Sequence, residues 1–166
     1  ADLRGMIDSG VAMKAATKEG NSPRPLEGKV LAMIFDKAST RTRFSFEQAM
    51  RQAGGSTITT NASDMQLGRG EPVRDTARVL SRYVDAVMLR TNSHDTLTEF
   101  ASFSSVPVVN GLSDHNHPCQ IVAEVQPDRQ LLLAAFAIGH LETARRRSAV
   151  ERVDQWCQLC RREHSP

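Results

Sequence analysis

Short apolar runs of strand length alternate with stretches of helical spacing along most of the chain. The apolar runs predict strands over residues 30–35, 86–89 and 106–109, and a short run rich in β-branched residues predicts another over residues 56–60. The intervening patterns predict helices over residues 3–18, about 42–53, 73–83 and 94–103. Strands that alternate with helices in this way predict an α/β fold, a parallel sheet with helices on both faces.

The helical patterns carry distinct apolar stripes. The first stripe after strand 30–35 consists of Phe46, Ala49, Met50 and Ala53. The next consists of Val73, Ala77, Leu80 and Val84. Gly54-Gly55 provides a stop for the first of these helices, and residues 61–72, with Gly68, Gly70 and Pro72, predict a loop.

The segment from Ser39 to Arg43 reads Ser-Thr-Arg-Thr-Arg and joins a predicted strand to the start of a predicted helix. Unpaired backbone N–H groups and the positive end of the helix dipole meet there. With two guanidinium groups and several hydroxyls added, the segment predicts an anion site, and phosphate is the anion that suits it best. Simpler readings are that Ser39 and Thr40 only cap the helix and that the arginines are solvated.

Two further predicted strands end in polar clusters. Arg90-Thr91 follows one strand, and Asn110 begins a polar stretch that continues to Gln120. Pro118 is suited to the first position of another helix. Because ligands of parallel sheets bind at the carboxyl ends of the strands, we expect all three polar clusters to face one crevice.

Composition narrows the function classes. The chain has 166 residues, enough for one domain with its own core, and a formal charge of +2, which gives no reason to expect nucleic acid. No apolar run is long enough to cross a bilayer, and the start lacks the pattern of a signal peptide. Three cysteines do not form a disulfide framework, so a reducing cytoplasm is expected.

Four sequence strings carry a family resemblance: Ser39–Arg43 with the following Phe-Ser-Phe-Glu-Gln-Ala-Met, then Met-Gln-Leu-Gly-Arg-Gly-Glu, Met-Leu-Arg-Thr and His-Pro-Cys-Gln. In order and spacing they resemble the carbamoyltransferases, most closely those that act on ornithine. The resemblance implies that residues 1–124 form a carbamoyl phosphate-binding domain. It also implies transfer of a carbamoyl group from carbamoyl phosphate to ornithine, which gives citrulline and phosphate, in a homotrimer without metal or organic cofactor. Arginine synthesis is the expected role of this reaction, and a role in arginine breakdown remains open.

The same resemblance implies the site residues. Carbamoyl phosphate would be bound by Ser39, Thr40, Arg41, Thr42, Gln66, Arg90, His117 and Gln120. Arg90, His117 and Thr42 would be catalytic, because they would stabilise the carbonyl oxygen as it becomes negative. Gln66 would reach the carbamoyl phosphate of a neighbouring subunit, although an ordinary loop amide is the alternative. Cys119 is read as a buried small side chain and not as a nucleophile, since no base is paired with it.

The likeness stops at residue 124, and residues 125–166 form a divergent tail in the place of the amino acid-binding domain. Both a helical and a partly disordered tail remain open. Cys157, Cys160 and His164 have tolerable zinc spacing, but a second proper pair of ligands is lacking, so no metal is assigned. A change of reading frame in GC-rich DNA is one origin for such an arginine-rich segment.

Three kinds of function therefore remain. The chain is an ornithine carbamoyltransferase-like enzyme, a truncated module that binds carbamoyl phosphate without turnover, or a fragment that only joins trimers. A fourth alternative keeps the chemistry but changes the acceptor, because enzymes that use putrescine or acylated ornithine share much of this domain.

Overall fold

A computed structural model describes residues 3–66, 70–115, 117 and 119. The described residues form one four-stranded parallel sheet in the order β2-β1-β3-β4. The strands are β1 (Val30–Phe35), β2 (Ser56–Asn61), β3 (Ala86–Arg90) and β4 (Val108–Leu112). The helices are α1 (Leu3–Lys18), α2 (Thr40–Gln52), the short 3₁₀ helix η1 (Ala62–Asp64), α3 (Val73–Leu80) and α4 (His94–Phe103). The predicted α/β fold with a parallel sheet is confirmed.

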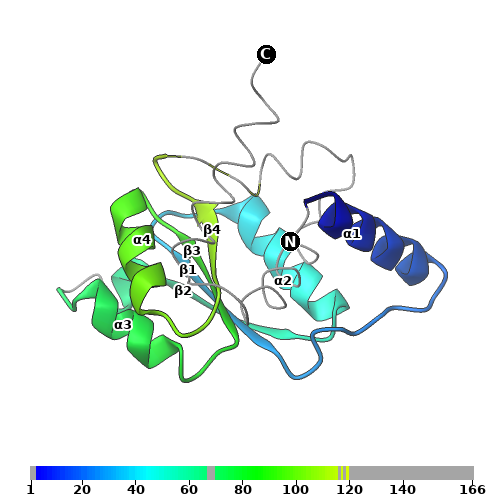
Figure 1. Cartoon of the computed structure of the whole chain (residues 1–166), viewed down its shortest axis with the longest axis horizontal. Coiled ribbons are helices and arrows are strands. Elements are labelled where there is room, and N and C mark those ends of the chain that lie inside the picture. The colour runs from blue at the N-terminus through cyan, green and yellow to red at the C-terminus, as the bar shows by residue number, and fades with distance from the viewer. Residues whose placement is uncertain (1–2, 67–69, 116, 118, 120–166) are drawn as a thin grey trace, which may run out of the picture.

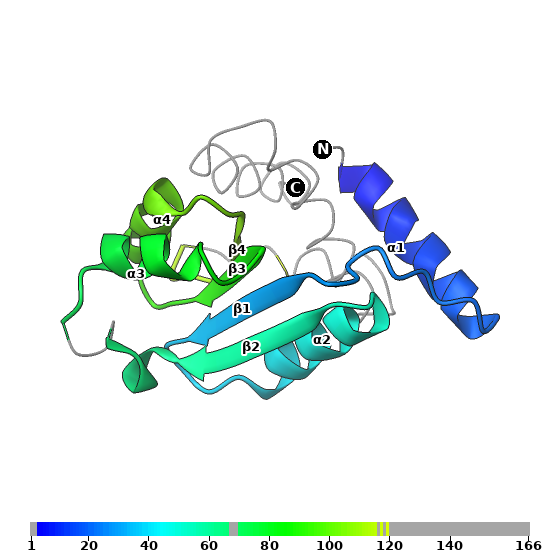
Figure 2. The same cartoon turned by 90° about the horizontal axis from the view of Figure 1, so that it is seen from below.

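Strand β1 shows how the two faces of the sheet are filled. Leu31, Met33 and Phe35 pack with Phe46 and Met50 of α2. The intervening residues belong to a second cluster, which consists of Ala32 and Ile34 of β1, Ala77 of α3, Leu97, Phe100 and Ala101 of α4, and Val84, Val87, Leu89 and Val108. Figures 1 and 2 show α3 and α4 on one side of the sheet and α2 on the other. The period of two in a strand is what separates the cores.

Several element boundaries differ from the sequence prediction by one to three residues. The helix expected from residue 42 begins at Thr40, and the helix expected over 73–83 ends at Leu80. The strand expected over 106–109 is Val108–Leu112. Pro107 has no N–H to donate, and it enters the sheet only through its carbonyl, which accepts from Val87 N at 2.9 Å.

The order of the strands explains where the helices lie. The chain leaves β1 in one direction to form β2 and then crosses to the opposite side of β1 to form β3 and β4. Right-handed crossovers in opposite directions place α2 on one face and α3 and α4 on the other. The carboxyl ends of β1 and β3 therefore border the point where the direction of winding reverses, which is where open α/β sheets bind ligands.

The edge strand β2 contributes least to the core. None of its residues is buried, and Ile58 is 54 % exposed. Thr59 donates a hydrogen bond to Glu47 of α2 at 2.9 Å, and the same carboxylate pairs with Arg43 at 3.0 Å. Polar contacts between side chains therefore take part in joining α2 to this edge of the sheet.

Length and hydropathy can be judged for the helices of the described ranges. Among them we find none that is both long and apolar enough to span a bilayer. The predictions for residues 125–166, including the zinc alternative, fall outside the described residues.

Candidate anion site at the carboxyl edge of the sheet

The carboxyl ends of β1 and β3 are held side by side. Phe35 is paired with Arg90 in the parallel register, and Asp36 N donates to Arg90 O at 2.9 Å. The Asp36 side chain then accepts from Asn92 N at 3.1 Å. A carboxylate from one strand end therefore anchors the turn that follows the other strand.

The first turn of α2 opens at this edge. Ser39 is the N-cap residue and is extended, with φ −146° and ψ 105°, but its side chain makes no capping hydrogen bond. In α4, by contrast, the N-cap Ser93 accepts from Thr96 N at 3.2 Å. The hydroxyl of Ser39 therefore accepts no hydrogen bond from the first-turn amides of α2. An anion at this helix end could accept hydrogen bonds from both the hydroxyl and the amides.

Arg90 reaches from the end of β3 to this helix. Its Nη1 donates to Thr42 Oγ1 at 3.0 Å, and both side chains are half-buried. Its Nε is buried and has no hydrogen-bond partner among the residues that the structure describes. A guanidinium held in this way keeps donors for an oxygen-rich anion. Two of the three strand ends that the sequence predicted to converge therefore meet directly.

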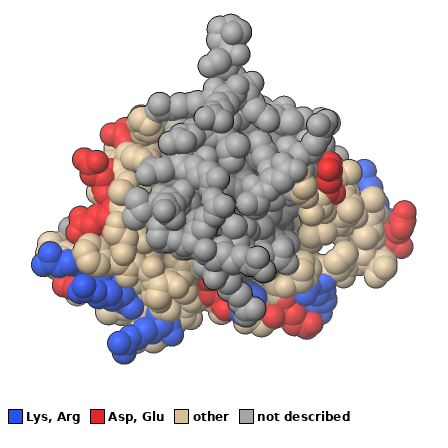
Figure 3. Space-filling model, in the orientation of Figure 1, with Lys and Arg blue, Asp and Glu red and all other residues tan. Residues whose placement is uncertain are grey.

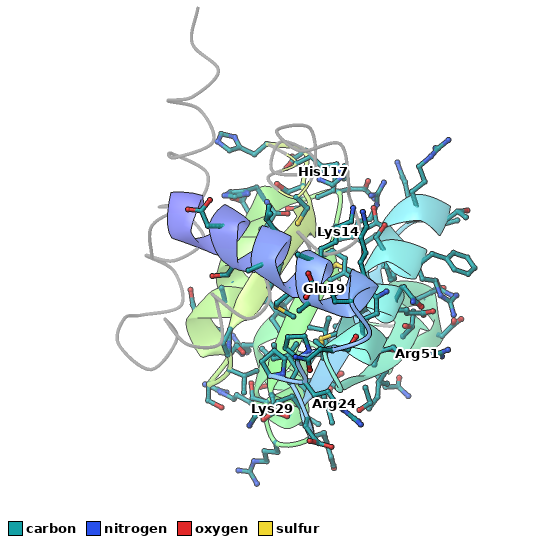
Figure 4. The ribbon with its side chains drawn as sticks, turned by 90° about the vertical axis from the view of Figure 1, so that its right-hand side faces the viewer. Lys14, Glu19, Arg24, Lys29, Arg51 and His117 are labelled. Carbon is teal, nitrogen blue, oxygen red and sulfur yellow. The ribbon has the colours of Figure 1, made fainter. Side chains whose placement is uncertain are left out.

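The end of β4 lies beside Arg90. Arg90 is paired with Leu112, and Thr91 N donates to Leu112 O at 3.0 Å. His117, which is half-buried, follows this strand by a short segment. Figure 4 shows His117 at the end of the molecule opposite Lys29, which precedes β1, so His117 lies toward the carboxyl edge of the sheet.

The remaining predicted site residues lie further from this contact. Thr40 and Arg41 are exposed on the first turn of α2. Gln66 is exposed shortly after η1, at the edge of the sheet that β2 forms, and its carbonyl accepts from Glu71 N at 3.0 Å. Gln120 falls outside the described residues.

Arg43, the second arginine of the segment, is engaged elsewhere. It pairs with Glu47 one turn further along α2. Burial raises the pKa of the Glu47 carboxyl, but the hydrogen bonds from Arg43 and Thr59 and the charges of Arg43 and Arg51 outweigh it, so the pKa is lowered from 4.5. Arg43 therefore stabilises the contact of α2 with β2.

The side chain of Cys119 is structural. It is 3 % exposed, belongs to the core under α2, and donates its S–H to Asn110 O at 3.1 Å. These observations agree with the prediction of a buried small side chain. Within the described ranges, no group of three or more His, Cys, Asp and Glu side chains is arranged to hold a metal ion.

Sequence reasoning missed several residues that organise this edge. Asp36 was not singled out, and Asp114 and His94 were read only as parts of a polar turn and a helix. Asp114 Oδ1 accepts from His94 N at 2.8 Å, as Asp36 does from Asn92 N. The one signal available was an aspartate just after a strand, which is too common a pattern to assign a role.

On the face of the molecule that Figure 3 shows, both acidic and basic side chains lie around the rim.

Comparison with known proteins identifies the family of this chain. Residues 1–127 match the family described as aspartate/ornithine carbamoyltransferase, carbamoyl-P binding domain. The chain is 60 % identical over 124 residues to the ornithine carbamoyltransferase of Mesorhizobium japonicum and 56 % identical over 124 residues to that of Agrobacterium fabrum. Each alignment covers 75 % of this chain and 41 % of the relative, so the chain spans about two-fifths of the length of these proteins.

Solved structures give the same result. The ornithine carbamoyltransferase of Burkholderia thailandensis matches with a TM-score of 0.70 and 45 % identity, over 75 % of this chain and 43 % of that one. The enzyme of Pyrococcus furiosus matches with a TM-score of 0.72 and 36 % identity, over 97 % of this chain and 59 % of that one. The chain therefore belongs to the aspartate/ornithine carbamoyltransferase family, with the carbamoyl-P binding domain of that family in its residues 1–127.

Proposed function

We propose that the edge formed by α2, β3 and β4 binds carbamoyl phosphate and is one half of an ornithine carbamoyltransferase active site. The observation that carries the proposal is the hydrogen bond from Arg90 to Thr42, which joins a guanidinium to a helix N-terminus at the reversal point of the sheet. A dianionic phosphate needs many donors, and Ser39, Thr40, Arg41 and Thr42 supply backbone, hydroxyl and guanidinium donors in one turn.

The carbamoyl end of the ligand would meet the other residues. Arg90 would bridge the phosphate and the carbonyl oxygen, and His117 and Gln120 would contact the carbonyl and the amide. When a neutral amine attacks the carbonyl carbon, the oxygen becomes negative, and Arg90, His117 and Thr42 would stabilise it. The C–O bond to phosphate would then break, and phosphate would leave with its growing charge held by the arginines and take up the proton that the amine loses. Holding both reactants together would supply much of the acceleration.

Sharing of the site between subunits is part of the proposal. Gln66 follows the edge strand β2 and is exposed, which is the position that a residue donated to a neighbouring copy needs. We therefore propose a homotrimer in which Gln66 contacts the carbamoyl phosphate of the next subunit.

Two measurements test the proposal. Titration calorimetry with freshly dissolved carbamoyl phosphate should show saturable binding, and Thr42→Val should weaken it, because Thr42 would lose its hydroxyl. No binding by the unmodified chain would refute the binding site. A citrulline assay with ornithine then separates turnover from binding alone, and parallel reactions with putrescine and acetylated ornithine identify the acceptor.

A further inference from the structure

The first residue of α4 makes two contacts with the segment that follows β4. His94 N donates to Asp114 Oδ1 at 2.8 Å, and the ring Nδ1 lies 3.1 Å from Ser113 Oγ, in hydrogen-bond contact. The rings of His94 and His115 also lie against each other, with centroids 4.9 Å apart. One histidine therefore holds three successive residues of a segment about twenty positions further along the chain.

These contacts lie between two residues of the proposed site. Along the chain, His94 follows shortly after Arg90, and Ser113 and Asp114 shortly precede His117. Ser113 is 5 % exposed and also accepts from Asn110 Nδ2 at 3.4 Å. Ser113 and Asn110 are the buried members of this network, while His94 is half-buried and Asp114 is exposed. A polar network that is satisfied in this way helps to fix the conformation of the segments that it joins.

Capping of α4 explains only part of this arrangement. Ser93 already caps the first turn locally by accepting from Thr96 N. The carboxylate of Asp114 comes from the neighbouring strand end, so its contact ties two strand ends together as well as capping a helix. The ring contact with Ser113 does nothing for the helix termini.

We infer that His94 is a positioning residue of the carbamoyl phosphate site, which acts by fixing the segment that carries His117 relative to the turn after Arg90. The inference rests on the proposed function. Since His117 would contact the carbonyl group while Arg41, Thr42 and Arg90 would contact the phosphate, His94 acts on the carbamoyl half of the ligand and leaves the phosphate half unchanged.

Comparison of two ligands tests this division. Carbamoyl phosphate and inorganic phosphate are titrated into the full chain and into His94→Ala. We expect the affinity for carbamoyl phosphate to fall about three- to tenfold, as loss of one hydrogen bond does, and the affinity for inorganic phosphate to change less than about twofold. Glu99→Ala, an exposed change on the same helix, is the matched control and should bind both ligands as the unmodified chain does.

Two further variants separate positioning from folding. His94→Asn keeps a polar atom near the place of Nδ1 and should restore most of the affinity. Ser113→Ala removes the contact with His94 and the bond from Asn110, and it should cause the same selective loss. The double variant should lose no more than Ser113→Ala alone, because the contact that His94→Ala removes is already absent there. If His94→Ala fails to fold, Ser113→Ala alone decides the question.

The possible failures are distinct. Carbamoyl phosphate affinity that is unchanged in both His94→Ala and Ser113→Ala overturns the inference and leaves the proposed function intact. Equal losses for both ligands also overturn it, since they show a structural role only. An unmodified chain that binds neither ligand overturns the proposed function and the inference together.

Discussion

Replacement of Arg90 by methionine should separate ligand binding from stability. Methionine keeps an unbranched apolar side chain but removes the charge and every N–H donor. In the ligand-free protein the change has two opposite effects. Loss of the bond to Thr42 removes about 1.5–3 kcal/mol. The buried Nε, which has no partner within the described part of the chain, no longer incurs a desolvation penalty of about 1–3 kcal/mol.

These effects nearly cancel, so we expect the free energy of unfolding of Arg90→Met to lie within about 1 kcal/mol of the original. Binding has no such compensation. Charge-assisted contacts to phosphate and carbonyl oxygens would be lost in a partly desolvated site, which weakens carbamoyl phosphate binding by about 2–4 kcal/mol, or about 30- to 700-fold.

Titration calorimetry measures the affinity, and urea unfolding without ligand measures the stability. Arg82→Met is the matched control, because Arg82 is exposed beyond the end of α3. The reasoning is refuted if Arg90→Met binds carbamoyl phosphate as tightly as Arg82→Met does. A fall of more than about 3 kcal/mol in the unfolding free energy would contradict the expected cancellation and show that Arg90 is needed for the fold.

Three other changes follow from particular contacts. Arg41→Ala should weaken carbamoyl phosphate binding by about 2–4 kcal/mol in calorimetry, with unchanged urea unfolding, because this exposed side chain would act only on the ligand. Gly111→Ala should destabilise the fold by about 1–3 kcal/mol, read as a lower melting temperature, since its methyl group would overlap the buried Met88 sulfur. Burial raises the pKa of Asp85, but the hydrogen bonds from Lys29 and Val30 N outweigh this and lower it below 3.8. The ionised Asp85 carboxylate therefore stabilises the fold above pH 3.8. In urea unfolding, Asp85→Asn should lower the unfolding free energy by about 1 kcal/mol at pH 7 and by progressively less as the pH falls below 3.8. An equal loss at pH 7 and below pH 3.8 would contradict this.

The two faces of the sheet were predictable from apolar spacing, and the reason is local. Phe46, Ala49 and Met50 recur at helical intervals, and all three are buried against the sheet. The start of β4 was not predictable in the same way, because Val106 and Pro107 look like strand residues in isolation. The hydrogen-bond ladder between β3 and β4 requires backbone N–H donors from β4, and a proline has none to donate.

The contact between Arg90 and Thr42 was anticipated only as a convergence of strand ends. The supporting contacts of Asp36, His94 and Asp114 were missed, since each one depends on which strands are neighbours and in what register. Such information is not contained in the spacing of residues along one chain. Common residue types after a strand therefore reveal an organising role only when the strand order is known.

The strand order also accounts for the division of the proposed site. Because β1 and β3 are neighbours, Thr42 and Arg90 meet although 48 positions separate them along the chain. Strand β2 lies on the far side of β1, so the segment that leaves it toward Gln66 starts at the outer edge of the sheet. One reversal of winding therefore brings the groups proposed to bind phosphate together within a subunit and places the segment toward Gln66 at the outer edge. A site that is shared between subunits needs both properties, and in this chain they follow from the same order of four strands.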